Sequence, residues 1–192
     1  MYSGQVDEWN DRLKSLKKVD APLKLYVPGN HDYYPFYFEG LASSQLRRQA
    51  GVKMLRTHDP LYVLPNGMTL LSVPYVTGLP GWAYNVEDDW LYDWLIQTTD
   101  GQEVDIVVSH APMYQMLDAI HPLENTPAKR NHVGTRAFNK WFHERLVKPL
   151  GWINGHIHES YGHMYHEGCH FYNVAQCDRN YDQNNDPVLI EL

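Results

Sequence analysis

The sequence predicts a single layered α/β domain, and three observations carry that prediction. Patterns typical of helices and of strands alternate along the chain before strands dominate the last part. Hydrophobic residues make up 43% and charged residues 20%, a globular composition. The 192 residues contain no repeat, linker or low-complexity segment, and they can bury a sizeable core. We therefore expect one domain over residues 1–192 that contains at least one mixed sheet.

The expected elements of the first half rest on local patterns. Apolar residues at helical spacing begin at Val6, and a second helical stretch is stopped by Gly51. An alternating segment runs into Pro28, and Asn66-Gly67 separates two apolar runs as in a hairpin. In order we expect a helix over 5–18, a strand over 23–27, a helix over 39–50 and a hairpin of 61–64 with 68–73.

The second half alternates helices with short apolar runs. Trp90, Leu91, Trp94 and Leu95 mark one helix, and acidic residues in its first turn suit the helix dipole. A second apolar stripe holds Phe138, Trp141, Phe142 and Leu146. In order we expect a helix over 87–98, a strand over 104–108, a helix over 135–147, a strand over 152–154, and short strands over 161–166, 169–174 and 187–192.

Charge and composition exclude several classes of protein. The net charge of −7 argues against non-specific binding to nucleic acids or anionic membranes. No apolar run approaches the roughly 18 residues of a membrane span, and the first residues do not resemble a signal peptide. Cys169 and Cys177 are too few for a disulfide framework. We expect a cytoplasmic protein with two reduced thiols, and a single bridge between them is the alternative.

Three of the predicted strands end in polar turns that carry histidine. The turns are Gly29-Asn30-His31-Asp32, Ser109-His110-Ala111-Pro112 and Gly155-His156-Ile157-His158. Ligands of α/β sheets bind at the carboxyl ends of strands, so these turns predict one convergent site.

The residue types in these turns suit metal and acid chemistry. Asn30 offers an amide oxygen as a ligand, His31 an acid, and Asp32 a carboxylate that orients the imidazole. His156 and His158, two residues apart in an extended stretch, face the same side. Taken singly, each motif is as well explained by a plain turn or by hydrogen-bonded histidines, so only their combination is informative.

The three motifs in this order resemble the calcineurin-like metallophosphoesterase family, from about residue 20 to the end of the chain. Residues 155–162 with 171–175 are similar to small metallophosphoesterase-domain-containing proteins that hydrolyse cyclic nucleotides. The resemblance implies two packed β-sheets flanked by helices and a two-metal site whose bridging water attacks phosphorus. It also implies these roles: Asn30, His110 and His156 bind one metal, His158 binds the second, and His31 with Asp32 forms the catalytic dyad.

The chain departs from the family pattern at its start. The Asp-x-His and Gly-Asp-x-x-Asp motifs, which supply further ligands, are not found before Gly29, and Gly4 more simply begins the first helix. Three accounts remain open: an N-terminally truncated fragment, a degenerate member, or completion by another chain. We favour the first. A missing strand would also leave unpaired edges beside residues 23–27 or 104–108, open to a partner chain or an oligomer.

The leading hypothesis is metal-dependent hydrolysis of a phosphomonoester or phosphodiester, such as a cyclic nucleotide, with Mn, Zn or Fe as one or two ions. The alternatives are a non-catalytic interaction protein and a single-metal binding module. Two groups of residues are further candidates for substrate contact, against solvated charges and core packing as the plainer interpretations. The basic group is Lys129, Arg130 and Arg136, and the aromatic group is Tyr33, Tyr34, Phe36 and Tyr37.

Overall fold

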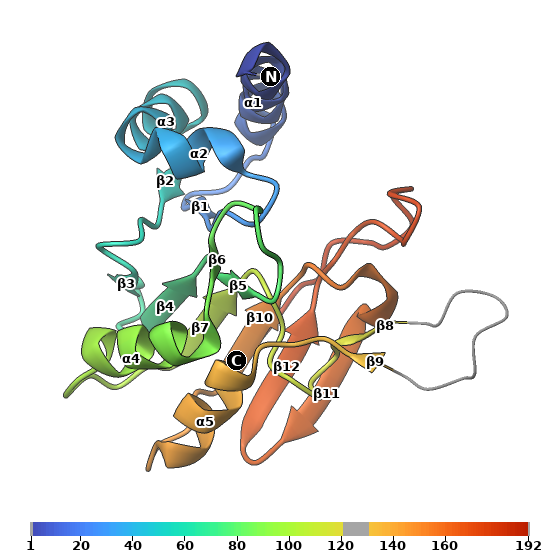
Figure 1. Cartoon of the computed structure of the whole chain (residues 1–192). Helices are drawn as coiled ribbons and strands as arrows, with labels where there is room; N and C mark the ends of the chain where they lie inside the picture. The colour runs from blue at the N-terminus through green and yellow to red at the C-terminus, as the bar shows by residue number, and fades with distance from the viewer. Residues whose placement is uncertain (1, 121–130, 192) are drawn as a thin grey trace, which may run out of the picture.

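A computed structural model of the chain describes residues 2–120 and 131–191 (Figure 1). The helices are α1 (Tyr2–Lys17), α2 (Tyr33–Tyr37), α3 (Glu39–Gln45), the π-helical η1 (Leu46–Ala50), α4 (Asp88–Thr98), α5 (Arg136–Glu144) and the 3-10 turn η2 (His158–Ser160). The strands are β1 (Leu25–Tyr26), β2 (Lys53–Met54), β3 (Leu61–Val63), β4 (Thr69–Val73), β5 (Val76–Thr77), β6 (Asn85–Val86), β7 (Ile106–Ser109), β8 (Ala119–Ile120), β9 (Asn131–His132), β10 (Gly151–Asn154), β11 (Gly162–His166) and β12 (Cys169–Asn173).

A six-stranded mixed sheet forms the centre of the molecule, in the order β11-β12-β10-β7-β4-β3. The four inner strands are parallel, and the antiparallel strands β11 and β3 close the two edges. Because β7 and β10 are parallel neighbours, their carboxyl ends lie side by side at one edge of the sheet.

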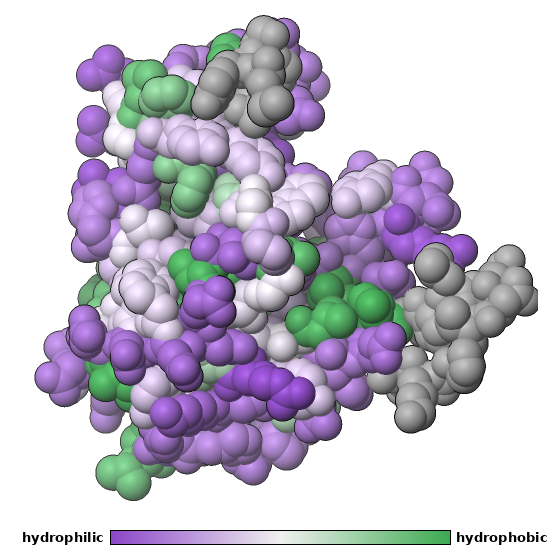
Figure 2. All heavy atoms as spheres, in the orientation of Figure 1, coloured by the Kyte–Doolittle hydropathy of each residue, from purple (hydrophilic) through white to green (hydrophobic). Residues whose placement is uncertain are grey.

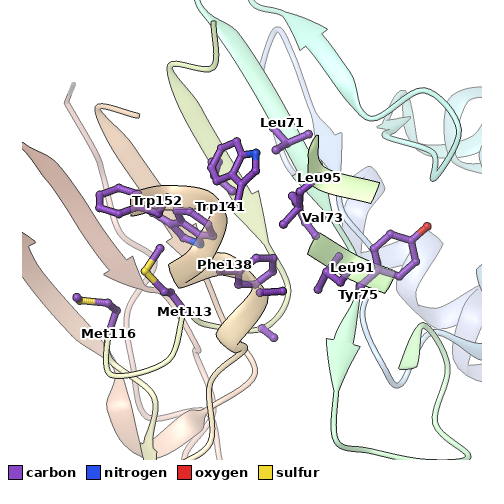
Figure 3. Packing of buried hydrophobic residues seen from close by; sticks show 14 of the residues in the cluster. Leu71, Val73, Tyr75, Leu91, Leu95, Met113, Met116, Phe138, Trp141 and Trp152 are labelled. Carbon is purple, nitrogen blue, oxygen red and sulfur yellow. The ribbon is translucent and has the colours of Figure 1, made fainter. Parts of the chain in front are cut away.

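Helices α4 and α5 cover one face of this sheet and bury the main core (Figure 3). Leu71, Val107 and Trp152 point from neighbouring strands toward Leu91 and Phe138 on the helices, and all five side chains are fully buried. The Trp152 indole in this core donates to Ser109 Oγ over 2.8 Å, whereas the buried Tyr84 hydroxyl has no hydrogen-bond partner among the described residues. This packing fixes the strand ends that carry the histidine turns.

The N-terminal part forms a second core on the other side of the loop at residues 29–32. Trp9 and Leu13 of α1 pack against Leu46 of η1, and the Trp9 indole donates to Gln45 Oε1 over 2.7 Å. The two-stranded parallel sheet β1–β2 lies beside this core. Its residue Leu25 packs toward the second face of the large sheet, where a cavity of about 970 Å³ remains.

The predicted fold class is confirmed: a multistranded mixed sheet is flanked by helices. The helices expected over 5–18, 39–50 and 87–98 are present as α1, α3 with η1, and α4. The hairpin around Asn66-Gly67 is also present, and Gly67 takes the positive φ of +91° that its turn needs. The strands 152–154, 161–166 and 169–174 correspond to β10, β11 and β12.

Two local predictions were wrong. Residues 187–191 form no strand, and the helix expected to reach 147 ends at Glu144. There Lys148 Nζ donates to the Phe142 and His143 carbonyls, so a side chain caps the helix and Leu146 is left fully exposed.

An unpaired strand edge was expected beside residues 23–27 or 104–108. The edge beside 104–108 is not free, because β7 is paired on both sides by β4 and β10. Strand β1, within residues 23–27, is paired by β2 alone among the described residues, so its other edge is open.

The part of the chain that the structure describes contains no helix that is long and apolar enough to cross a membrane.

Candidate functional site

The site lies where the carboxyl ends of β7 and β10 meet the loop that follows β1. His110 directly follows β7, and its backbone N–H donates to the Val73 carbonyl over 2.8 Å. His156 comes two residues after β10, and its ring centroid lies 4.8 Å from that of His110. Two of the three histidine turns are therefore brought together by strand pairing alone.

The third turn reaches these histidines through a close backbone approach. Asn30 is 3% exposed, and its Oδ1 lies 2.7 Å from His110 Nε2. A Cβ atom on Gly29 would lie 2.3 Å from the Cε1 and Nδ1 atoms of His110, so only glycine lets the loop pass this ring. The three predicted ligands of one metal, Asn30, His110 and His156, thus stand together.

Both inner histidines are neutral over the physiological range. Burial, reinforced by the neighbouring imidazoles, lowers the pKa of His110 to about 3 and that of His156 to about 4. A neutral imidazole keeps a lone pair free for a metal, and the Asn30 amide adds an oxygen. These three donors fit a single divalent ion of the Mn, Zn or Fe type.

The described residues do not assemble a larger acidic ligand set. Within residues 2–120 and 131–191 no group of three or more His, Cys, Asp or Glu side chains is placed to hold a metal ion. The donor set Asn30, His110 and His156 includes an amide instead of a carboxylate, so these three residues supply no negative charge to the ion.

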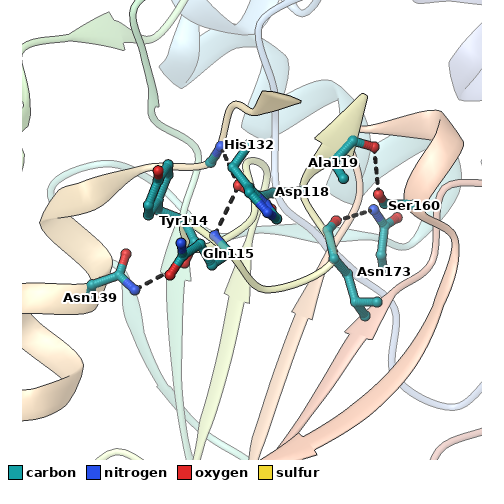
Figure 4. Close-up of polar contacts among 10 residues, drawn as sticks. Tyr114, Gln115, Asp118, Ala119, His132, Asn139, Ser160 and Asn173 are labelled. Carbon is teal, nitrogen blue, oxygen red and sulfur yellow. Dashed lines mark hydrogen bonds and ion pairs between the residues drawn. The ribbon is translucent and has the colours of Figure 1, made fainter. Parts of the chain in front are cut away.

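His158 lies in the same pocket but is held separately from the inner pair. Its Nδ1 lies 2.7 Å from the Asp178 carbonyl, which leaves the Nε2 side of the ring available as a ligand. Two bonds fix the loop below it: Asn173, fully buried, donates to the Ile157 carbonyl over 2.8 Å, and Ser160 Oγ donates to the Ala119 carbonyl over 2.8 Å. Figure 4 shows the Ser160 bond among these contacts.

Asp32 has different partners from those that the sequence suggested. Its Oδ2 accepts from the Gly29 N–H over 2.7 Å, and its Oδ1 forms an ion pair with Arg12 on α1. The His31 ring instead packs edge-to-face on Trp82. The expectation that Asp32 orients His31 does not match these contacts: the carboxylate holds the 29–32 turn against α1. A catalytic role for either residue stays a prediction.

A pocket of about 650 Å³ opens above these residues, and its lining includes side chains that were not anticipated from the sequence. It is lined by Asn30 and the four histidines of the turns, together with Trp82, Arg179 and Tyr181. In Figure 2 a hydrophobic patch lies on this face over the β8–β9 side of the strand ends. Trp82 follows Gly-Leu-Pro-Gly just after β5, so its place in a loop behind a strand end was the available signal.

The described residues among those expected to contact substrate do not line this pocket. Tyr34 stacks on Trp9 in the N-terminal core. Phe36 packs edge-to-face on Tyr84 but is 44% exposed, and the Tyr33 ring lies 6.2 Å from that of the pocket residue Trp82. Arg136 lies over the Tyr114 ring at 3.8 Å. Lys129 and Arg130 fall outside the described residues.

A second histidine–carboxylate pair supports the rim of the pocket (Figure 4). Asp118 is fully buried, and its Oδ1 lies 2.5 Å from His132 Nδ1. Its Oδ2 accepts from the backbone N–H groups of Gln115 and Gly134 over 2.9 and 2.8 Å. The carboxylate thereby ties the loop before β8 to the residues after β9.

Comparisons with known proteins identify the family and the fold of the chain. The model of the calcineurin-like phosphoesterase family matches residues 2–160. Metallophosphoesterase domain-containing protein 1 from Homo sapiens and from Mus musculus are each 26% identical over 209 residues, which cover 98% of this chain. The chain spans 60% of the length of these two relatives. One solved crystal structure shares the fold with a TM-score of 0.68 at 13% identity, over 89% of this chain and 64% of that one.

Proposed function

The chain belongs to the calcineurin-like phosphoesterase family, and we propose that it hydrolyses a small phosphomonoester or phosphodiester with a bound divalent metal ion. One observation supports this proposal: Asn30, His110 and His156, which carry neutral donor groups, lie against one another in the lining of a pocket of about 650 Å³. Such an ion supplies an activated water and neutralises phosphoryl charge. Cyclic nucleotides are among the diesters to be tested.

The chain's own residues would bind and orient the ester. Arg179 lines the pocket and would pair with a phosphoryl oxygen. His31 would donate an N–H to a phosphoryl or leaving-group oxygen, because burial and the positive charge of Arg12 lower its pKa and favour the neutral ring. Asp32 would act on the reaction only by holding the turn that carries Asn30 and His31.

We propose His158 as this chain's ligand to a second ion of a dinuclear site. The carbonyl of Asp178 at Nδ1 supports this role because it orients the ring and leaves Nε2 free. Glu159 lines the same pocket, but the described residues form no group of three or more His, Cys, Asp or Glu side chains around a second ion. The two-ion state would therefore need further donors, and the one-ion state is the arrangement that Asn30, His110 and His156 support.

Metal content and hydrolysis, measured together, test the proposal. The protein is loaded with Mn, desalted, analysed for metal per chain and assayed with bis(p-nitrophenyl) phosphate and p-nitrophenyl phosphate. We expect at least one ion per chain and metal-dependent release of p-nitrophenolate, both lost in His110→Ala. His58→Ala is the control, because His58 pairs with Glu39 and does not line the pocket. Hydrolysis that survives in His110→Ala at the wild-type rate would reject the assignment.

A further inference from the structure

Two aromatic side chains stand exposed in the pocket beside the outer histidines. Trp82 is 40% exposed, and its ring centroid lies 4.7 Å from that of His31 in an edge-to-face arrangement. Tyr181 is 66% exposed and lies 5.1 Å from the His158 ring and 6.2 Å from the His31 ring, again edge-to-face. Burial in a core explains neither ring, because both leave a large part of their apolar surface open to the pocket.

The backbone around each ring is well anchored. The turn that carries Trp82 is closed by a bond from the Leu79 N–H to Asn85 Oδ1 over 2.7 Å and by one from the Trp82 N–H to the Leu79 carbonyl over 3.2 Å. Tyr181 has a φ of +66°, a left-handed conformation that is unfavourable for a tyrosine. Its N–H donates to the Asp178 carbonyl, the same oxygen that holds His158. The two rings are therefore presented by loops that are fixed relative to the site.

The pocket combines these rings with a positive charge. Arg179 lines it together with the acidic Glu159, and among the described residues Arg179 has no ion-pair partner, so its guanidinium is available to a ligand. Planar aromatic walls bind flat rings by stacking, which is worth about 1–3 kcal/mol per nucleic-acid base, whereas guanidinium and imidazole groups bind phosphate. The volume of about 650 Å³ lies well inside the range of small-molecule sites, and a phosphoryl group alone would fill little of it.

We propose that Trp82 and Tyr181 form an aromatic subsite that binds a flat ring attached close to the phosphoryl group of the substrate. The preferred substrate would be an aryl phosphoester or a phosphoester that carries a nucleobase, instead of an alkyl or plain sugar phosphate. This inference rests on the proposed function, because it places the phosphoryl group at Asn30, His110 and His156.

Binding, measured apart from turnover, tests the subsite. The Mn-loaded protein is titrated calorimetrically with phenyl phosphate, AMP, ribose 5-phosphate and inorganic phosphate. We expect at least one of the two aromatic ligands to bind about 10-fold more tightly than ribose 5-phosphate and phosphate, the lower end of the stacking range. Tighter binding of phenyl phosphate alone would identify a small aryl group, and that of AMP alone a nucleobase.

Variants decide whether the two rings cause this preference. In Trp82→Leu and Tyr181→Leu we expect the aromatic preference to fall below 3-fold while the affinity for ribose 5-phosphate changes less than 2-fold. Trp90→Leu and Tyr165→Leu are matched controls, because these exposed rings lie on α4 and β11 outside the pocket. Equal affinity for all four ligands, or equal weakening of all four in the variants, would overturn the subsite. A preserved preference without any hydrolysis would overturn only the proposed function.

Discussion

The ion pair between Arg12 and Asp32 gives the sharpest test of how the turn at residues 29–32 is held. The Asp32 side chain is 10% exposed, and its only other partner in the described contacts is the Gly29 N–H. Arg12→Met keeps an unbranched apolar stem and removes the guanidinium and its charge. Breaking a fully buried pair costs about 3–5 kcal/mol. Because the Arg12 side chain is 37% exposed, solvent screens part of this, and we expect a loss of roughly 2 kcal/mol.

Urea unfolding of a double-mutant cycle measures this value. Asp32→Asn alone should cost a similar amount, and the double variant Arg12→Met/Asp32→Asn should cost about 1–2 kcal/mol less than the sum of the two. Mn retention should fall in both single variants, because the turn also carries Asn30. Arg47→Met, at an exposed position on η1, is the control. Strictly additive losses, or full Mn retention in both single variants, would show that Arg12 does not position this turn.

Three further predictions concern packing, ionisation and a buried carboxylate. Gly29→Ala should destabilise the protein by about 1–3 kcal/mol and lower Mn retention, measured by elemental analysis, because its methyl would lie 2.3 Å from the His110 ring. Burial raises the pKa of Cys169 to about 12, so at pH 8 a thiol reagent should label Cys177 quickly and Cys169 only on unfolding. Because the pKa of Cys169 is higher in the folded than in the unfolded protein, the contribution of this thiol to stability is complete below pH 9 and is lost as the pH rises toward 12. Alkaline unfolding measures this: the stability of the wild type should fall more steeply between pH 9 and 12 than that of Cys169→Ala. Asp118→Asn should cost about 1–3 kcal/mol in a thermal unfolding assay, because the buried carboxylate accepts two backbone N–H groups.

Most of the regular elements could be predicted because local chemistry specifies them. The turn at Asn66-Gly67 and the amphipathic helices α1 and α4 are each specified by residues a few positions apart. The packing of these elements into the tertiary structure then stabilises the same local conformations. The two-residue strands β5, β6, β8 and β9 carry no periodic pattern and exist through distant partners. The end of α5 depends on Lys148, which lies beyond the helix itself. Helix boundaries set by such side chains are not visible in hydrophobic spacing.

The proximity of the histidine turns could be predicted from the sequence, but the contacts that hold them could not. Histidines that follow neighbouring parallel strands lie side by side, so we expect His110 and His156 to be close from their positions alone, and their ring centroids are 4.8 Å apart. The ion pair of Asp32 with Arg12 could not be predicted from the sequence, because Arg12 lies on a helix whose position depends on tertiary packing. Tyr181 comes from a turn near the end of the chain, in a conformation that tyrosine residues seldom adopt. No local sequence pattern predicts the contacts of Tyr181 with His158 and His31.

The turn at residues 29–32 reaches the site by a route that differs from that of the two inner histidines. Strand β1 belongs to a separate two-stranded sheet, so backbone pairing does not align it with β7 and β10. The close passage of Gly29 over the His110 ring and the Asn30–His110 contact supply the alignment instead. An ion held by Asn30, His110 and His156 would therefore join the N-terminal core to the large sheet. Ligand binding and the mutual packing of these two parts of the molecule should then be thermodynamically coupled, since whatever stabilises one stabilises the other.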